Sequence, residues 1–380
     1  MQCPGRLAGS LLLASLCFCL IPQFITALEI LRTFREPEDR PFQRLAVHPR
    51  TGDVYVGGTD RLHRLGSDLS LLQSAATGPR EDNPDCPPPL LPCDLPRVNT
   101  PALTKALLVD GQKDVVVLCT SLFHGQCQTL RGSNITLSTG FSTQPVVPND
   151  AASSCVIFLK PGEDAGSSPQ VLYVGAEYSS LGNRKYRDLV PSLSRRLLPS
   201  LELAYRDADG SSRLTVLPEQ RENFKIEFVY GFHHEGFAYF LTTQPKSKQS
   251  SQVVTRLARI CEADNYFRSY VEIPLECGDA GVVSDFIARA AAVTADRESL
   301  VVSFSSQGSK KSSKVCNFSI EDLNVAFNTT VEDCYSGRGH VGPQHYHKRQ
   351  GCKQTVSYSS CIKIKRLIYL LFVLFLSVSP

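Results

Sequence analysis

Short runs of alternating hydrophobic and polar residues recur along the chain, whereas long helical patterns are scarce. The runs are rich in β-branched and aromatic residues and end at Gly, Pro, Asn or Asp, which is typical of strands joined by tight turns. In most of them a short strand leads through a polar turn into a more hydrophobic strand, as in "RLAVHPRTGDVYVGG" (44–58). This pattern predicts an all-β protein.

The runs group into five units of similar strand–turn–strand design. They lie at residues 44–65, 104–130, 154–178, 224–244 and 285–306. Repetition at roughly 50 to 70 residues is typical of the blades of a β-propeller. An array of β-sandwiches is the alternative, but such domains would show separating linkers and a buried tryptophan, and the chain has no tryptophan.

The amino terminus predicts export. Arg6 precedes the apolar run "LLLASLCFCLI" (11–21), which is too short to span a bilayer, and Ala27 offers a cleavage position. We therefore expect a signal peptide over residues 1–27. A chain that follows it enters the secretory pathway, where cysteines are oxidised.

The cysteines fit an oxidising compartment. There are fourteen, and loss of the leader removes Cys3, Cys17 and Cys19, which leaves eleven. In "CTSLFHGQC" Cys119 and Cys127 bracket a turn between two strand-like runs, so we expect a disulfide that closes a hairpin. The spacing is not that of a zinc site, and a redox pair would need Cys-x-x-Cys.

No motif predicts an enzyme or a metal site. "GRGHVG" (337–342) matches G-x-G-x-x-G, but it follows no strand and precedes Pro343, so it is interpreted as a glycine-rich loop. His340, His345 and His347 lie close together in a polar loop, where histidines are more often solvated than metal-bound. No catalytic, cofactor or metal residue is predicted, and the net charge of +3 gives no strong attraction to nucleic acid or membrane.

Three Asn-x-Ser/Thr tripeptides mark expected glycosylation positions. They begin at Asn134, Asn317 and Asn328. Attachment of an oligosaccharide requires an exposed side chain in a secreted protein. We therefore expect these three segments on the surface.

The last residues differ from the rest of the chain. "IKIKRLIYLLFVLFLSVSP" (362–380) is basic and then apolar, and its apolar part, 367–376, is well short of the roughly 20 residues needed to span a membrane. We expect a tail unrelated to the preceding domain. A weakly membrane-associating tail is the alternative.

The repeats and the cysteine pattern together resemble the sema domain, a seven-bladed propeller, and within it the plexins. "LAVHPRTGDVYVGGTDRLHRLGSDLSL" resembles the first plexin blade, "LCTSLFHGQC" a plexin hairpin, and "FVYGFHHEGFAYFLTTQ" the core of the fourth blade. The resemblance covers about residues 28–361. It implies a partial sema-type propeller with about five of seven blades, in which the strand "LEILRTF" (28–34) lacks its partner in the last blade.

The resemblance also implies a function. It predicts the extracellular, semaphorin-binding portion of a plexin-like receptor, truncated before the stalk, membrane span and cytoplasmic region. The partners implied are a semaphorin-type protein and a co-receptor, and the chain would be secreted or retained in the secretory pathway. Scatter-factor receptor kinases share the sema domain, so a growth-factor-binding fragment is the nearest alternative. A secreted propeller hydrolase is a second, for which no motif is present.

By the same resemblance, ligand contact is expected on the third-to-fourth blade loops. "LGNRKYRDL" (181–189) offers Tyr186 beside Arg184, Lys185 and Arg187. Interfaces favour Tyr and Arg as anchors. An ordinary solvated basic loop is the alternative interpretation.

The resemblance finally implies the remaining cystines. In the short segment "CPPPLLPC" a disulfide would join Cys86 to Cys93. The other expected pairs are Cys277 with Cys316, Cys334 with Cys352, and Cys261 with Cys361. Cys155 is left over. Because it opens the apolar run "CVIFL", we expect it to be a buried free thiol.

Overall fold

The computed structural model describes residues 32–87, 92–160, 170–278, 285–308, 312–342 and 345–346. The chain divides into two units, Met1–Thr33 and Phe34–Pro380, and every helix and strand below lies in the second. The expected signal peptide, most of "LEILRTF", Cys352, Cys361 and the tail 362–380 lie outside the described residues.

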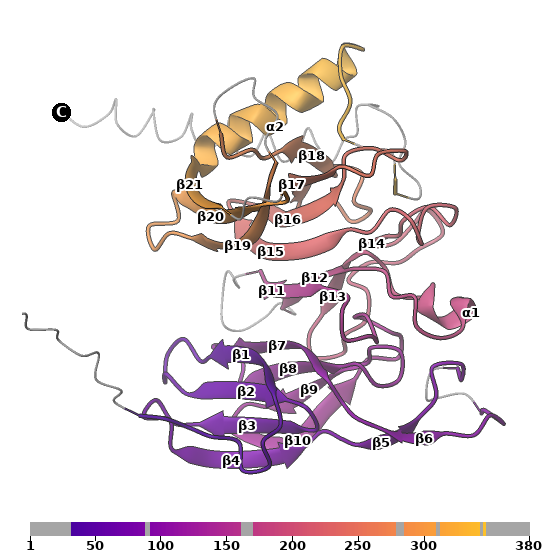
Figure 1. The fold of residues 1–380 in the computed structure, drawn as a ribbon, viewed down its shortest axis with the longest axis vertical. Coiled ribbons are helices and arrows are strands. Elements are labelled where there is room, and N and C mark those ends of the chain that lie inside the picture. Colours follow the sequence, from indigo (N-terminus) through magenta and orange to yellow (C-terminus); the bar gives the residue numbers. More distant parts are fainter. Residues whose placement is uncertain are drawn as a thin grey trace, which may run out of the picture. The chain divides into compact units, whose positions relative to one another are not determined.

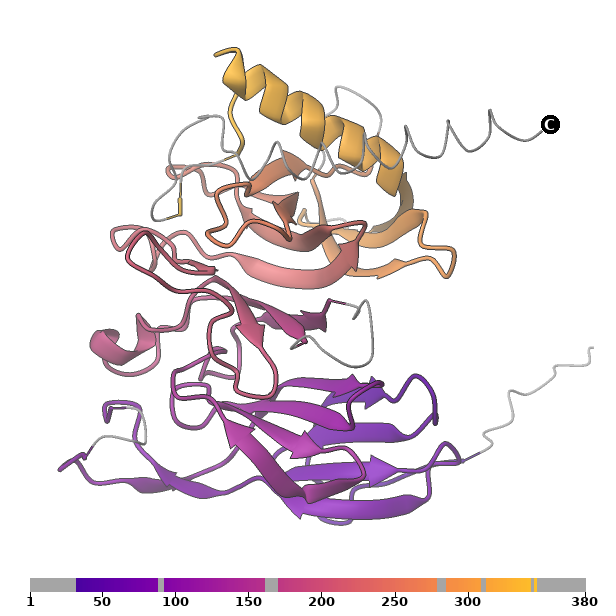
Figure 2. The ribbon, with the colours of Figure 1, turned by 180° about the vertical axis from the view of Figure 1, so that it is seen from behind.

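Five antiparallel sheets follow one another along the second unit (Figure 1 and Figure 2), one for each predicted repeat. The first contains β1 (Phe42–Val47), β2 (Val54–Gly58), β3 (Arg61–Leu65) and β4 (Leu71–Ala76). The second contains β7 (Thr104–Asp110), β8 (Val115–Thr120), β9 (Cys127–Arg131) and β10 (Asn134–Phe141). The third contains β11 (Cys155–Leu159), β12 (Val171–Ala176), β13 (Leu193–Leu197) and β14 (Arg213–Leu214).

The fourth sheet contains β15 (Glu227–His234), β16 (Phe237–Pro245), β17 (Val253–Cys261) and β18 (Val271–Pro274). The fifth contains β19 (Phe286–Val293), β20 (Ser299–Ser306) and β21 (Ser313–Ser319). Between the first and second sheets, β5 (Arg80–Asp82) and β6 (Val98–Thr100) pair as a separate two-stranded ribbon.

Neighbouring sheets pack through their first strands. β1 lies against β7, β7 against β11, β11 against β15, and β15 against β19. Within each sheet the later strands follow in chain order away from the first strand. This arrangement is that of propeller blades, so the prediction of an all-β propeller-type fold is confirmed.

Two phenylalanines and two glycines fix the packing of the third sheet on the fourth. Phe228 of β15 lies over Gly175 of β12, and Phe158 of β11 lies over Gly231 of β15. Because carbon atoms pack about 3.5–4 Å apart, a Cβ at either glycine would collide with the facing ring. Both rings also contact Phe240, whose centroid lies 5.2 Å from that of Phe158 and 6.1 Å from that of Phe228. We call these two reciprocal contacts the Phe–Gly interlock.

The one long helix that the structure describes is α2 (Ile320–Tyr335), which follows β21. The Ser319 side chain caps it by accepting the Asp322 backbone N–H at 3.2 Å. Its buried side chains recur every three or four residues and pack into the core of the last two sheets: Ile320, Leu323, Phe327 and Val331. The prediction that helices are scarce overlooks this one, although its cap and its spacing are sequence signals of a helix.

Substitution of Gly231 by Ala tests the Phe–Gly interlock. The added methyl group would collide with the Phe158 ring. Because overpacking of a core is destabilising, we expect the free energy of unfolding to fall by about 1–3 kcal/mol. Urea denaturation followed by circular dichroism measures this. Gly278→Ala is the matched control, because no atom of the described residues lies within 4 Å of its added Cβ. Equal losses in the two variants would contradict the interlock.

Candidate functional site

Three segments that are distant in sequence meet beside the third sheet. We call them the loop platform, which consists of residues 83–86, 121–126 and 178–189. The backbone N–H of Asn183 donates to the Pro84 carbonyl oxygen at 3.2 Å. The His124 ring is hydrogen-bonded to the Cys86 carbonyl oxygen at 2.6 Å, and its centroid lies 5.3 Å from that of Tyr186. His124 is buried, so it ties all three segments together.

Two disulfides constrain segments of the loop platform. Cys119 joins Cys127 at directly opposite positions of β8 and β9. Cys86 joins Cys93 in the loop carried by the β5–β6 ribbon, with their Cα atoms 5.6 Å apart. These are the first two pairs named from the sequence, and neither resembles a metal clip or a redox motif.

The tip of the "CTSLFHGQC" hairpin has an unusual backbone. Phe123, His124 and Gly125 all have positive φ angles, of 53°, 65° and 85°. A Cβ at position 125 would collide with the Val147 carbonyl group, so glycine is required there. The Asp82 carboxylate holds the tip by accepting the Phe123 N–H at 2.8 Å.

The segment predicted to contact ligand forms α1 (Arg184–Arg187), a single turn. It joins β12 to β13 and therefore belongs to the third sheet, not to a connection between the third and fourth. The Asn183 side chain caps its start by accepting the Lys185 N–H at 2.9 Å. Asp188 fixes its end through an ion pair with Arg221 and a hydrogen bond from the Tyr178 hydroxyl, both at 2.7 Å. Burial and this hydrogen bond raise the pKa of Tyr178, so it stays a donor.

The four predicted contact residues divide into two pairs. The Arg187 side chain is only 15% exposed and forms an ion pair with Glu222 at 2.7 Å. Tyr186 is half-buried. Arg184 and Lys185 are exposed, and 55% of the Arg184 side chain is accessible. Arg187 and Tyr186 therefore hold the segment in place. Arg184 also donates to the Pro218 carbonyl oxygen at 3.0 Å and pairs with Asp188 at 3.4 Å, but both Arg184 and Lys185 keep their positive charge at the surface.

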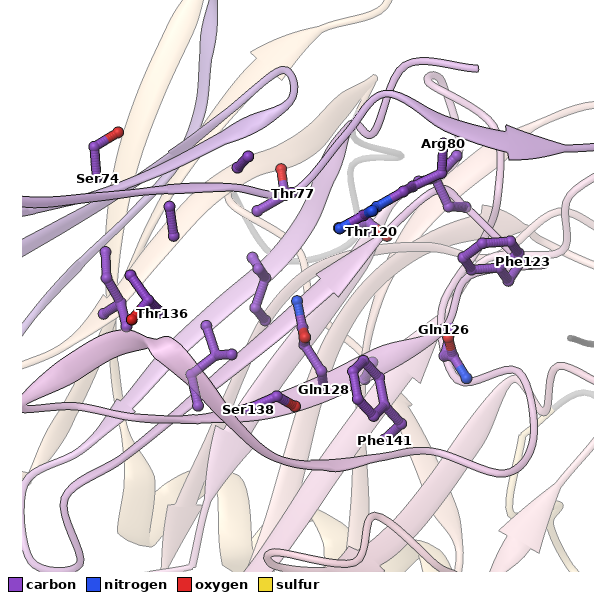
Figure 3. A pocket seen from close by; sticks show the side chains of 17 residues that line it. Ser74, Thr77, Arg80, Thr120, Phe123, Gln126, Gln128, Thr136, Ser138 and Phe141 are labelled. Atoms are coloured by element: carbon purple, nitrogen blue, oxygen red, sulfur yellow. The ribbon is translucent and has the colours of Figure 1, made fainter. Parts of the chain in front are cut away.

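A hollow of about 390 Å³ lies on the first and second sheets (Figure 3). Arg80 and Phe123 lie at one end of it, and Ser74 and Thr136 lie toward the other. The lining mixes apolar side chains with hydroxyl and amide side chains, and Arg80 is its one charged residue among those described. Phe123 also belongs to the loop platform, so the two surfaces adjoin. No sequence pattern marks the hollow, because its lining comes from separate strands.

The leftover cysteine is a buried thiol. Cys155 forms no disulfide, and its Sγ lies 3.1 Å from the Lys105 carbonyl oxygen. Lys105 is itself buried, and its Nζ donates to the Ser153 carbonyl oxygen at 2.8 Å. Burial raises the pKa of the Cys155 thiol, so it is protonated and unreactive in the folded chain.

The later cysteines are also oxidised. Cys277 joins Cys316 of β21 across 39 residues of sequence. Cys261 and Cys334 are disulfide-bonded as well. Their expected partners, Cys361 and Cys352, lie outside the described residues, so these two pairings stay predictions.

The histidines and the three sequons have different surroundings. His340 is exposed, whereas His345 is fully buried, 3.3 Å from the Glu272 carboxylate; His347 is outside the described residues. Among the residues that the structure describes, no group of three His, Cys, Asp or Glu side chains could hold a metal ion. No helix of that part of the chain is long and apolar enough to cross a membrane. The sequons lie at the start of β10 (Asn134), in β21 (Asn317) and within α2 (Asn328).

Comparison with known proteins gives the family. No protein-family model matches the chain. Mouse plexin-A2 is 30% identical to it over 376 residues, which covers 87% of this chain and 19% of plexin-A2. The extracellular region of plexin A4 matches with a TM-score of 0.68 and 26% identity, over 84% of this chain and 38% of that one. The chain carries a plexin-type sema domain.

This plexin relationship confirms the resemblance found in the sequence. Drosophila semaphorin 2a shares the fold, with a TM-score of 0.54 and 17% identity over 76% of this chain and 49% of that one. The chain spans about a fifth of the length of the curated plexins it matches (19% of plexin-A2). The part of plexin A4 that the chain matches lies in its extracellular region.

Replacement of His124 by Ala tests the assembly of the loop platform. The change removes the hydrogen bond to Cys86 and the ring contact with Tyr186. We expect backbone amides of residues 184–189 to exchange hydrogen roughly tenfold faster, which corresponds to about 1.4 kcal/mol of local opening free energy. Mass spectrometry of exchanged peptides measures this. His340→Ala, at an exposed position, is the control, and unchanged exchange in His124→Ala would count against the assignment.

The pKa of Cys155 gives a second prediction. Burial raises the pKa, so above the ordinary thiol pKa of about 8.5 only the unfolded chain loses this proton. We expect its contribution to unfolding free energy to be complete below that pH and to decline above it. Iodoacetamide should label Cys155 slowly in the folded protein and rapidly in urea. Cys155→Ser should lack this alkaline decline, and fast labelling of the folded chain would contradict the burial.

Proposed function

We propose that this chain is the semaphorin-binding extracellular portion of a plexin-like receptor. The observation that carries the proposal is the loop platform, on which exposed Arg184 and Lys185 are held beside a plexin-type sema sheet. Relationship to the extracellular region of plexin A4 supports an extracellular location. The leader-like residues 1–27 and the oxidised cysteines support entry into the secretory pathway.

The geometry of the loop platform suits protein recognition. Its backbone is fixed by two disulfides, by the Asn183 cap and by the Asp188–Arg221 ion pair. A rigid segment loses little conformational entropy on binding, which leaves more of the contact energy for affinity. Exposed cations at the edge of an interface mainly accelerate association with an acidic partner. We expect the contacting semaphorin surface to be rich in carboxylates.

The plexin relationship also orders the alternatives. It favours a semaphorin over a scatter factor as the ligand, because the relatives reported above are plexins. A ligand-binding region needs no catalytic residues, so the same relationship favours a receptor over a hydrolase. Arg187 and Tyr186 act in this proposal by positioning the segment, and Arg184 and Lys185 act by direct contact.

Charge reversal at the exposed pair tests the proposal. We expect Arg184→Glu with Lys185→Glu to weaken semaphorin binding roughly 10- to 100-fold, mainly through slower association and with a smaller dependence on salt. Surface plasmon resonance against a panel of immobilised semaphorin ectodomains, with scatter factors included, measures both rates.

The control makes the same change of net charge elsewhere. Lys314→Glu with Arg338→Glu alters an exposed position of β21 and one just after α2, where 71% of the Arg338 side chain is accessible. It should bind semaphorin like the unaltered chain. Unchanged binding in the Arg184/Lys185 variant, or equal weakening in both variants, would remove α1 from the interface. Binding to scatter factors alone would overturn the semaphorin assignment.

A further inference from the structure

The hollow between the first and second sheets begins where their shared core ends. Leu118 of β8 and Leu130 of β9 pack in that core with residues of both sheets. Every second residue of a strand points to the same face. Thr120 therefore shares the face of Leu118, and Gln128 shares the face of Leu130. The interface between the two sheets thus changes from apolar to polar along its length, and the hollow lies over this change.

Short side chains on the first sheet leave the space between the sheets open. β4 contributes Ser74, Ala75 and Ala76 to the lining, and Thr77 follows them. Figure 3 shows Thr77 and Gln128 on opposite sides of the hollow. Its volume of about 390 Å³ lies toward the lower end of the range for ligand-binding pockets. The hollow therefore suits a small ligand.

Two polar groups of the lining lack a natural counterpart. The Thr77 hydroxyl oxygen is buried and has no hydrogen-bond partner among the described residues, which is a costly state for a polar atom. Arg80 is exposed, and no carboxylate of the described chain lines the hollow beside it. A ligand that brings hydroxyl groups and one negative charge would complement both groups.

The same lining disfavours three other classes of small ligand. An amine would bring a positive charge to a lining whose described part has a cation and no carboxylate. A polyphosphate or polysulfate would bring several negative charges to that single cation. A wholly apolar ligand would bury hydroxyl and amide groups without partners. The rings of Phe123 and Phe141 also line the hollow, and aromatic rings provide a surface for the apolar face of a ligand.

We propose that the hollow binds a sugar that carries one carboxylate, such as a uronic acid or a sialic acid. The Arg80 guanidinium binds the carboxylate, because its planar fork matches the two oxygens and the hydrogen bonds are charge-assisted. The Thr77 and Thr120 hydroxyls and the Gln128 amide bind the hydroxyl groups of the sugar. α1 takes no part in this site, so the proposal is independent of semaphorin binding.

The first experiment tests the chemistry of the ligand. Ligand-observed NMR measures binding of methyl glucuronide and methyl sialoside to the full chain. Methyl glucoside is the control ligand, because it differs from the glucuronide only by lacking the carboxylate. We expect the full chain to bind at least one acidic sugar about tenfold or more tightly than the glucoside. Equal binding of all three sugars, no binding of any, or binding of a short glutamate-rich peptide in place of the sugars would overturn the proposal.

The second experiment tests the residues. Arg80→Gln should weaken binding of the acidic sugar about tenfold or more, because it removes the charge-assisted hydrogen bonds. Gln128→Glu, which adds a negative charge to the hollow, should do the same through repulsion. Arg131→Gln is the control, since it removes one charge from an exposed position at the end of β9, outside the lining. Thermal unfolding confirms that each variant is folded. Unchanged binding in both variants of the hollow, or an equal loss in the control, would overturn the site.

The third experiment identifies the source of the sugar. Sugar acids occur free, on glycoproteins and on glycolipids, so each is tested for displacement of the bound methyl glycoside. The competitors are free glucuronic and sialic acids, a sialylated glycoprotein, and phosphatidylcholine vesicles that carry a sialylated lipid. Displacement that sialidase treatment abolishes assigns the glycoprotein or the glycolipid as a source. A bound glycoside that none of the competitors displaces would overturn the proposal.

Discussion

The packing of the first strands of neighbouring sheets against one another is the constraint on which the rest of the structure depends. Glycine residues allow the sheets to approach closely enough for this packing. The Phe–Gly interlock sets the distance between the third and fourth sheets. A similar contact joins the first two, where the Thr104 side chain of β7 occupies the space beside Gly57 of β2. Each contact needs the absence of one Cβ, so the spacing of the sheets is encoded in a few positions.

The loop platform inherits its geometry from that packing. Its hairpin tip belongs to the second sheet and α1 belongs to the third, so His124 meets Tyr186 only where the two sheets are correctly placed. The disulfides act locally, because Cys119–Cys127 holds a hairpin that the strands already define. Sheet packing therefore assembles the candidate site, and the covalent links keep its loops in shape.

The features that sequence predicts well are those with a local pattern. Period-two alternation located the five sheets, and "CTSLFHGQC" showed its hairpin because both cysteines flank one turn. No local sequence pattern could show that Arg187 forms an ion pair that holds its segment, because its partner Glu222 lies 35 residues away. The same holds for the hollow around Arg80, whose walls come from separate strands. For α2 the signal was local as well, because the Ser319 cap and the apolar residues at every third or fourth position are sequence signals of a helix.

The division of labour within α1 bears on how such a protein can diversify. Tyr186, Arg187 and Asp188 maintain the segment through their contacts with the fold. Arg184 is exposed but donates to the Pro218 carbonyl oxygen at 3.0 Å and pairs with Asp188 at 3.4 Å, whereas Lys185 extends over the Tyr186 ring. The partners of Arg184, Arg187 and Asp188 all lie in the loops of the third sheet or between the third and fourth sheets, so substitutions in α1 affect these loops and leave the strands in place. In the proposed interface, the charge that α1 presents can therefore change while the sheets beneath it keep their packing.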